Sequence, residues 1–314
     1  MKNCYLIGGS GFIGRHLAQL LSGTQRRLTV VGRKPVCDPP LPEGVNYLSG
    51  NYGDDEILDA ICGDADEIVL LAYSTVPKTS FDDPVLDIMT NLPAAVKLFE
   101  KASHSRVGKL VFVSSGGTVY GNPSALPIAE DHHTTPISPY GITKLAIEKY
   151  AAMFHQTAGL PVICVRPGNA YGEGQRPFSG QGFIATAMAS IVQGKEVVLF
   201  GATGTVRDYL HVSELAEGVL AVLDHGRVGE AYNIGSGRGY SNRDILDCIA
   251  PMAAAAGLDM VVNVLPPRLF DVQVNILDCA KMERETGWRA VGDLKEGLQK
   301  TWDWFLSARG GNTP

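Results

Sequence analysis

The sequence predicts an α/β protein with a doubly wound parallel sheet and a smaller C-terminal lobe. Three observations predict this fold class. Short apolar, β-branched segments alternate with longer helical segments through the first half of the chain. A glycine-rich segment joins the first strand to the first helix. After Arg166 the chain becomes rich in glycine, proline and polar residues, which is typical of loops that line a site. Apolar strands alternating with helices indicate a parallel sheet covered on both faces.

The expected elements follow one another in a regular order. Strands are expected at residues 3–8, 27–33, 67–72, 109–115 and 161–168, and helices at 12–21, 84–103 and 140–159. Gly159 is expected to end the third of these helices, and Ser241 to cap a later one.

Composition limits the class of protein. The chain has 314 residues, a formal net charge of −6 and 45% hydrophobic residues, enough for a sizeable core. Because no basic block stands out, nucleic acid is not expected as a partner. No apolar stretch is long enough to span a membrane, and the N-terminus lacks the pattern of a signal peptide. Six scattered cysteines without a CxxC pair indicate reduced thiols and a cytoplasmic protein.

The glycine segment "LIGGSGFIGRHL" predicts a dinucleotide site. Gly8, Gly11 and Gly14 match GxxGxxG, and Gly9 with the latter two matches GxGxxG. Glycine permits a tight turn, close approach to a pyrophosphate, and packing of helix on strand. The helix N-terminus, with the amides of Phe12 and Ile13, offers hydrogen-bond donors to the phosphates. The alternative is a glycine-rich turn without a ligand. The chain is thus expected to be of the Rossmann type, with a dinucleotide-binding domain at 1–165 plus about 206–234, and a substrate lobe at about 166–205 and 235–314.

The end of the second strand leaves the choice of cofactor open. Gly32 stands where a carboxylate normally holds the adenosine ribose, and Arg33 and Lys34 follow. Arg33 is a candidate to bind a 2′-phosphate, which favours NADP. If Arg33 instead stacks on adenine or faces solvent, NAD is equally acceptable.

Tyr140 and Lys144 are the candidate catalytic pair. They lie four residues apart on an expected helix and so share a face. An ammonium and a cationic nicotinamide near a phenol both favour the phenolate, which suits proton transfer at neutral pH. The alternative is a surface tyrosine with a solvated lysine.

Six motifs together resemble the extended short-chain dehydrogenases/reductases, in particular nucleotide-sugar epimerases and dehydratases of the UDP-glucose 4-epimerase type. They are "GGSGFIG", "SSGGTVYG", "SPYGITK", "RPGNAYGEGQ", "RDYLHVSELAEG" and "YNIGSG". The resemblance implies that Tyr140 is the acid/base, and that Lys144 holds the nicotinamide ribose and lowers the pKa of the tyrosine. Many epimerases carry a hydroxyl residue where Gly116 stands here. Thr118 is therefore the expected substitute, with Ser114 and Ser115 as alternatives.

Further roles follow from the same resemblance. Ser114 and Asn91 are expected near the cofactor, although helix packing is an alternative for Asn91. Dehydratases of the superfamily carry an Asp-Glu pair where this chain has Gly117 and Thr118, so a dehydratase is rejected. The expected substrate-binding residues are Ser115, Asn169, Arg176, Arg207 and Arg268, with Tyr171 and Gln175 also possible.

Several residues keep an alternative reading. Asn169, Arg207 and Arg268 match residues that contact a nucleotide diphosphate, but Arg207 has the alternative of a buried pair with Asp208. His132 and His133 lack metal-ligand spacing and are expected to be solvated, so no metal is expected. Tyr73 falls where many relatives have a small residue near the cofactor.

The resemblance also implies an assembly and an activity. The helix of Tyr140 carries Leu145, Ile147, Tyr150, Ala151 and Phe154, and the family pairs this helix in a homodimer. Burial of these residues within the monomer is the alternative. The expected activity is a UDP-hexose 4-epimerase using NAD, with an NADPH-dependent 4-ketosugar reductase and a non-catalytic NADP sensor as alternatives. The sugar is open, and supply of a polysaccharide precursor is the favoured context.

Overall fold

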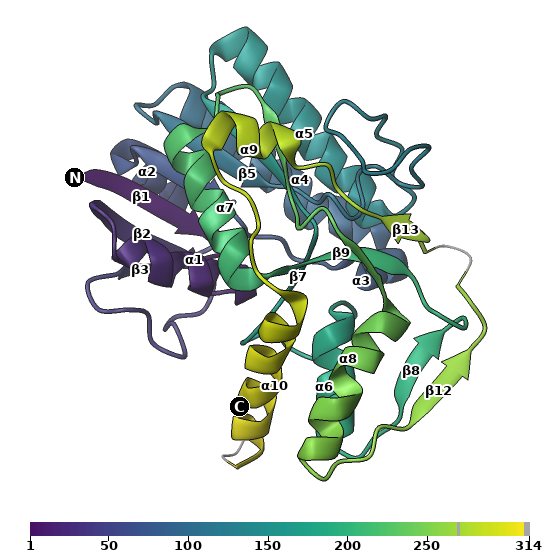
Figure 1. Ribbon diagram of the computed structural model, residues 1–314. Coiled ribbons are helices and arrows are strands. Elements are labelled where there is room, and N and C mark those ends of the chain that lie inside the picture. Colours follow the sequence, from purple (N-terminus) through teal and green to yellow (C-terminus); the bar gives the residue numbers. More distant parts are fainter. Residues whose placement is uncertain (269–270, 311–314) are drawn as a thin grey trace.

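The computed structural model describes residues 1–268 and 271–310 of the chain. A seven-stranded parallel sheet forms its larger part (Figure 1). The spatial order of strands is β10-β6-β5-β4-β1-β2-β3, so the order reverses between β1 and β4. In such a sheet a ligand binds beyond the carboxyl ends of the strands at this reversal. The strands are β1 (Lys2–Ile7), β2 (Arg26–Gly32), β3 (Asn46–Ser49), β4 (Glu67–Leu70), β5 (Lys109–Val113), β6 (Val162–Pro167) and β10 (Ala231–Ile234).

Helices cover both faces of this sheet. One face carries α1 (Phe12–Ser22) and α7 (Val212–His225), which share a buried core that includes Leu17, Leu215 and Val219. The other face carries α2 (Asp55–Asp64), α4 (Pro84–Ser103) and α5 (Pro139–Ala158), packed on β4 and β5 through residues such as Phe99 and Ile147. The predicted Rossmann-type, doubly wound fold is confirmed.

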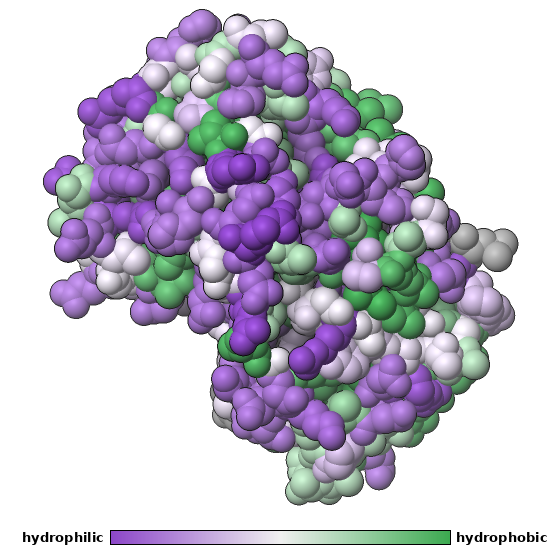
Figure 2. Space-filling model, turned by 45° about the horizontal axis from the view of Figure 1, so that its top comes forward, coloured by the Kyte–Doolittle hydropathy of each residue, from purple (hydrophilic) through white to green (hydrophobic). Residues whose placement is uncertain are grey.

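A smaller lobe lies beside the domain of the main sheet and has its own apolar core (Figure 1). The helices α6 (Phe183–Val192), α8 (Asn242–Ala255) and α10 (Leu294–Gly310) pack together around residues that include Met188, Ile249 and Trp302. Its strands are β7 (Asn169–Tyr171), β9 (Val206–His211), β11 (Gly239–Ser241) and β13 (Val274–Asn275), with a separate pair β8 (Val197–Phe200) and β12 (Val262–Leu265). Figure 2 shows a mostly hydrophilic face with separate hydrophobic patches.

Local signals set the helix ends. The Ser138 hydroxyl accepts a 3.1 Å hydrogen bond from the Gly141 N–H at the start of α5, and Gly159 ends the helix with φ 69°. Ser241 and Asp244 form a reciprocal capping box at α8, as predicted for Ser241.

Two short elements depart from the pattern of the sequence. The polar stretch after Arg166, expected to be loop, contains β7, whose three residues form a strand because they pair with β9. The helix α9 (Ala280–Thr286) packs against α7 and β10 of the main sheet, although the sequence groups it with the substrate lobe. The division of the chain at residues 165 and 235 stays a prediction.

The apolar residues of α5 also need a correction. Ile147 and Ala151 are buried in the core under α5, with Phe154 packed against it, and Leu145 lies against another buried cluster. Burial within the monomer therefore accounts for these four. Tyr150 alone of the set is exposed, at 41%.

Candidate active site

The turn after β1 is shaped by three glycines. Gly8 has φ +86°, and a β-carbon there would lie 2.6 Å from the backbone nitrogen of Ala72. A β-carbon on Gly14 would lie 2.5 Å from the Cα of Gly9, so α1 packs directly on the turn. Gly11 caps α1 without a side-chain acceptor. The first-turn amides, including those of Phe12 and Ile13, are therefore available to an anion. This cradle fits the pyrophosphate of a dinucleotide.

The end of β2 is closed to the carboxylate that a dinucleotide site usually has there. A β-carbon on Gly32 would lie 2.8 Å from the Tyr47 hydroxyl and 3.0 Å from the Ser10 hydroxyl. Tyr47 is fixed because its hydroxyl donates a 2.7 Å hydrogen bond to the Lys34 carbonyl. The side chain of Arg33 is exposed.

Tyr140 and Lys144 lie on the first two turns of α5 and share one face. The Lys144 ammonium is 5.7 Å from the centre of the Tyr140 ring and donates a 2.8 Å hydrogen bond to the Val113 carbonyl. Lys144 is only 3% exposed, so it is not the solvated lysine of the alternative interpretation. Burial lowers the pKa of Lys144 to about 7, against the opposing charges of Glu148 and Asp87.

The phenol of Tyr140 resists ionisation in the protein alone. Burial raises its pKa well above the ordinary value, and the negative charge of Asp87 adds to this. Ionisation therefore needs positive charge brought to the site, and an oxidised nicotinamide ring would supply it.

The hydroxyl-rich loop after β5 supplies two unpaired oxygens. Ser114 Oγ and Thr118 Oγ1 are buried and lack a hydrogen-bond partner within the described residues. The Thr118 carbonyl lies 3.0 Å from the position of a β-carbon on Gly141, the residue after Tyr140. The backbone of Thr118 thus lies against α5, and the buried, unpaired hydroxyl of this residue suits a polar ligand.

Gly116 has a packing reason of its own. A β-carbon there would lie 2.8 Å from both the Arg166 carbonyl and the Leu277 side chain. A serine therefore does not fit at Gly116 with this backbone. Its neighbour Ser115 is half-buried in the same loop.

Asn169 faces this loop from β7. A β-carbon on Gly117 would lie 3.4 Å from the Asn169 side-chain oxygen. The loop thus lies between α5 and the substrate lobe, and Gly117 brings no carboxylate to that space.

Arg207 and Asp208 do not pair with each other. The Asp208 carboxylate accepts hydrogen bonds from the backbone N–H groups of Ser236, Gly237 and Leu277. Successive residues of β9 point to opposite faces, which separates the two side chains. Arg207 forms a 2.8 Å hydrogen bond to the Val206 carbonyl, and burial lowers its pKa. A partly buried guanidinium of this kind favours an anionic ligand.

The remaining predicted substrate residues lie in varied surroundings. The Arg268 guanidinium stacks on Phe200, 3.5 Å from the ring centre. Arg176 is exposed. Gln175 is buried and donates a 3.1 Å hydrogen bond to the Ala170 carbonyl.

Asn91 organises the loop after β4. Its side-chain oxygen accepts a 2.8 Å hydrogen bond from the Ser74 N–H, and its amide donates to the Asp87 carbonyl. These contacts agree with the alternative that Asn91 serves helix packing. A direct contact between Asn91 and the cofactor stays a prediction.

His132 lies outside this region. Its ring is within 3.1 Å of the Ser124 hydroxyl, while His133 is exposed. Within residues 1–268 and 271–310, no group of three or more His, Cys, Asp or Glu side chains is arranged to hold a metal ion.

The helices of the described residues were also compared with the length and hydropathy that a membrane span needs. None of them is long and apolar enough to cross a bilayer.

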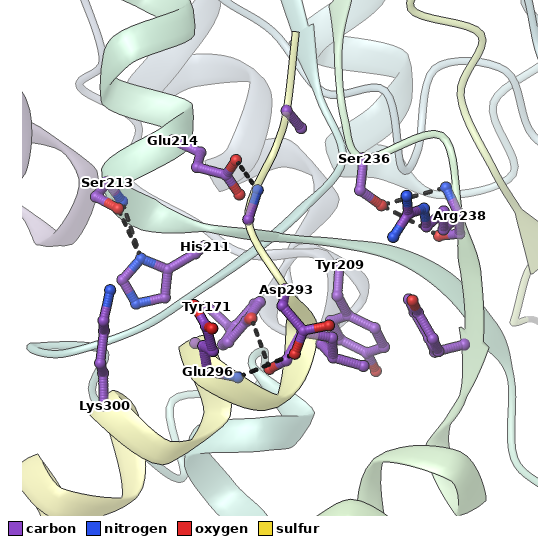
Figure 3. A pocket seen from close by; sticks show the side chains of 15 residues that line it. Tyr171, Tyr209, His211, Ser213, Glu214, Ser236, Arg238, Asp293, Glu296 and Lys300 are labelled. Carbon is purple, nitrogen blue, oxygen red and sulfur yellow. Dashed lines mark hydrogen bonds between the residues drawn. The ribbon is translucent and has the colours of Figure 1, made fainter.

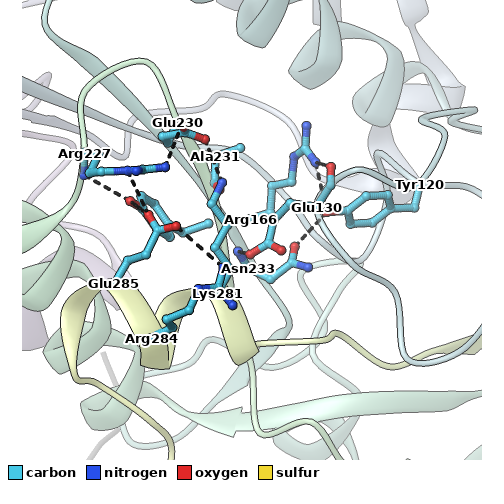
Figure 4. Close-up of polar contacts among 11 residues, drawn as sticks. Tyr120, Glu130, Arg166, Arg227, Glu230, Ala231, Asn233, Lys281, Arg284 and Glu285 are labelled. Carbon is cyan, nitrogen blue, oxygen red and sulfur yellow. Dashed lines mark hydrogen bonds and ion pairs between the residues drawn. The ribbon is translucent and has the colours of Figure 1, made fainter.

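Sequence reasoning missed a buried polar network centred on Arg166, whose contacts with Tyr120 and Glu130 Figure 4 shows. Arg166 pairs with Glu148 at 2.6 Å and donates a 2.9 Å hydrogen bond to the Tyr120 hydroxyl. That hydroxyl donates to Asn233 in β10 at 2.8 Å. The available signal was the spacing of Glu148, four residues after Lys144 on one helix face.

A separate cavity of about 80 Å³ lies between β9 and the start of α10 (Figure 3). Tyr171, His211 and Lys300 are among its lining residues. Tyr171 is 3% exposed and belongs to the core of the smaller lobe, so it is not placed in an open sugar-binding loop. Neither Tyr140 nor Lys144 lines this cavity.

A Tyr-Lys pair on one face of α5, together with a glycine-rich turn between β1 and α1, defines the class, an enzyme of the short-chain dehydrogenase/reductase type. More narrowly, the chain belongs to the NAD-dependent epimerase/dehydratase family, whose model matches residues 4–235. A dTDP-glucose 4,6-dehydratase of Streptomyces antibioticus is 31% identical over 320 residues, covering 98% of this chain and 93% of that protein.

Solved structures agree with this membership. A UDP-glucose 4-epimerase from Thermotoga maritima, solved with UDP-glucose, has a TM-score of 0.91 and 31% identity, covering 98% of this chain and 99% of that one. A UDP-glucose 4-epimerase from Thermus thermophilus, in complex with NAD, has a TM-score of 0.89 and 30% identity, with the same shares covered.

Proposed function

We propose that this protein is a nucleotide-sugar 4-epimerase of the UDP-hexose type that keeps NAD bound. The observation that carries the proposal is the half-buried Tyr140 with the buried Lys144 on one face of α5, and the unpaired hydroxyl of Thr118 in the loop against that helix. The glycine turn with Gly8 and Gly14 fits the cofactor. NAD, when bound, would accept a hydride from the sugar and return it.

The chain's own residues would handle protons and position. Tyr140, as phenolate, would take the proton of the 4-hydroxyl and give it back after the 4-keto sugar has turned. Lys144 would hold the nicotinamide ribose and keep the phenolate stable. Thr118 would bond the 4-oxygen, with Ser114 on the cofactor side and Ser115 on the sugar side.

The diphosphate would be held in the smaller lobe. Arg207 and Arg268 offer guanidinium groups, and Asn169 offers an amide beside Gly117. Holding the diphosphate while the sugar turns is what inversion at C4 requires, since the hydride must return to the other face.

Gly117 and Thr118 favour an epimerase over a dehydratase. Expulsion of a hydroxyl needs a general acid, and neither residue supplies a carboxyl group there. NAD is favoured over NADP because the NAD-dependent family model and the NAD complex of the Thermus epimerase are similar to this chain. Arg33 would then face solvent.

The test starts with purification without added cofactor, denaturation, and identification of the released nucleotide. Stoichiometric NAD and interconversion of UDP-glucose with UDP-galactose, or of their N-acetyl or uronic acid counterparts, would support the proposal. Tyr140→Phe should lower kcat by about 10²- to 10⁴-fold. The matched control is Tyr5→Phe, because Tyr5 is a buried tyrosine of β1 whose hydroxyl bonds Asp64 at the end of α2.

Two results would contradict the proposal. A protein that is purified empty, binds NADPH selectively and reduces a 4-keto nucleotide sugar would be the ketosugar reductase. A protein that binds the cofactor but whose cellular function survives Tyr140→Phe would be a sensor.

We also propose a homodimer formed through α4 and α5. Both helices expose large apolar side chains, namely Val85, Leu86, Ile88 and Met89 on α4 and Ile142, Tyr150 and Met153 on α5. Exposed apolar surface of this extent favours an interface. Sedimentation would test the homodimer by comparing the molecular mass of the wild type with that of Met89→Glu.

We further propose a cellular context. The six free cysteines favour the cytoplasm, and supply of a polysaccharide precursor is the proposed role.

A further inference from the structure

Asp87 is a fully buried carboxylate on α4, with 0% exposure. The contacts of its carboxylate in the described structure are hydroxyl groups. Tyr73 donates to it at 3.4 Å, and Thr75 donates a short hydrogen bond to the same group. A buried carboxylate is costly unless a positive charge compensates it, because two hydroxyls do not replace its hydration.

Tyr73 connects this carboxylate to the catalytic pair. The Lys144 ammonium lies 4.1 Å from the centre of the Tyr73 ring, within the range of a cation–π contact. The Tyr73 and Tyr140 rings meet edge to face, with centroids 4.8 Å apart. One side chain therefore touches Lys144, Tyr140 and Asp87.

The other charged groups around Lys144 already have partners. Glu148, one turn further along α5, pairs with Arg166 of β6 through the Nε and Nη2 groups of the guanidinium. From β5, the Val113 carbonyl accepts the ammonium hydrogen bond. Cys164 on β6 has its pKa raised by burial and stays a neutral thiol. Asp87 is thus the carboxylate near Lys144 that is not committed to another cation.

We propose that Asp87 is the counter-charge of the Lys144 ammonium, and that Tyr73 positions both groups, with its hydroxyl on the carboxylate and its ring face against the ammonium. Asp87 and Tyr73 are then positioning residues for the pair that the proposed epimerase function uses. The resemblance and the motifs quoted above give no role to Asp87.

The direction of the electrostatic effect follows from the charges. Burial disfavours the Lys144 ammonium, and the negative charge of Asp87 favours it. In Asp87→Asn the ammonium loses that support, so Lys144 releases its proton at lower pH. Neutral Lys144 would no longer stabilise a phenolate on Tyr140.

The ionisation of Lys144 can be measured without substrate, cofactor or turnover. The chain is labelled with lysine carrying ¹³C at Cε, and the shift of each resonance is followed against pH. The Lys144 resonance is assigned by its loss in Lys144→Met. This readout separates a failure of the inference from a failure of the proposed function, since an enzyme with another substrate would give the same titration.

The expected titration midpoint of wild-type Lys144 is about 7. In Asp87→Asn it should fall by about one pH unit, as expected for loss of one nearby charge. Glu67→Gln is the matched control, because Glu67 is also buried but lies at the opposite end of β4. It should leave the midpoint within about 0.2 unit.

Two further variants complete the design. Asp87→Ser, shorter and also neutral, should shift the midpoint in the same direction and serves if the asparagine variant does not fold. Tyr73→Phe keeps the ring and the charge of Asp87, and should move the midpoint less than either neutral variant. An unchanged Lys144 midpoint in a folded Asp87→Asn or Asp87→Ser protein would overturn the inference.

Activity gives a second readout once a substrate is found. The alkaline limb of kcat against pH should shift downward in Asp87→Asn by the same amount as the Lys144 midpoint. A uniform loss of kcat without a shift of that limb would show a purely structural role and would also overturn the inference.

Discussion

Asn275 in β13 donates a 2.9 Å hydrogen bond to the carbonyl of Gly116 in the loop after β5. Both groups are buried, so this bond ties the smaller lobe to the loop that carries Thr118. The two parts of the chain are 159 residues apart in sequence. The position of the loop that carries Thr118 therefore depends on the docking of a strand from the other lobe.

Replacing Asn275 should destabilise the protein. Asn275→Ala leaves the Gly116 carbonyl buried without its donor, at a cost of about 1–3 kcal/mol in the free energy of unfolding. Urea unfolding measures this change. Asn263→Ala removes an exposed asparagine that bonds Glu196 and should cost less than about 0.5 kcal/mol. Equal losses for the two variants would contradict a special role for Asn275.

The glycine turn predicts a selective effect on NAD binding. Gly14→Ala places a methyl group 2.5 Å from the Cα of Gly9, and the turn must move to accept it. Overpacking of about 1–3 kcal/mol should weaken NAD binding by about tenfold or more. Calorimetric titration of NAD into protein from which the bound cofactor has been removed measures the affinity. Gly63→Ala in α2 meets no atom within 4 Å and should leave NAD binding unchanged. Normal NAD affinity in Gly14→Ala would show that this contact does not shape the cofactor site.

Thr118 is predicted to act through its hydroxyl. Thr118→Val keeps the shape of the side chain but removes one buried hydrogen bond to the sugar, worth about 1.5–3 kcal/mol when the partner is charged. The value of kcat should fall by about tenfold to a hundredfold. Thr157→Val removes a hydroxyl that bonds the Met153 carbonyl on the exposed side of α5, and should leave kcat unchanged. If Thr118→Val retains kcat while Ser115→Ala loses it, the hydroxyl role belongs to Ser115.

Lys144 should lower the stability of the cofactor-free protein at acidic pH. Its pKa in the folded chain is about 7, below the ordinary value of 10.5, so the unfolded chain binds its proton more tightly. The free energy of unfolding therefore rises with pH between about 7 and 10.5. Lys144→Met should raise Tm more at pH 6 than at pH 9, while abolishing activity.

Lys97→Met provides the comparison for this measurement. Lys97 is 50% exposed and pairs with Asp55 on the surface, so its replacement should change Tm little at either pH. A gain for Lys144→Met that is the same at pH 6 and pH 9 would show that the buried charge is not its cause.

Local features of the sequence predicted much of the fold and part of the site. Hydrophobic periodicity, and the glycine and proline residues at segment ends, predicted the strands of the main sheet and the helices that cover it. These signals could be read because each depends on residues within one segment. The glycine turn and the Tyr140–Lys144 spacing were readable for the same reason. The separation of Arg207 and Asp208 also follows from alternation along a strand, and was available from the sequence.

Other features required the tertiary structure. Gly32 and Gly116 are glycines because Tyr47, Arg166 and Leu277 occupy the space around them, and these contacts come from distant segments. The apolar residues of α5 divided between core and surface according to which face α4 and β5 cover.

The sequence by itself determined the class of chemistry. The glycine motif of the dinucleotide turn and the four-residue spacing of Tyr140 and Lys144 can each be recognised within a few residues. Only the tertiary structure decided which charges surround that chemistry. Asp87 and Lys144 both contact Tyr73 because α4 and α5 pack together beside the loop that follows β4. Burial and charge balance are properties of that packing, and no pattern along one segment contains them.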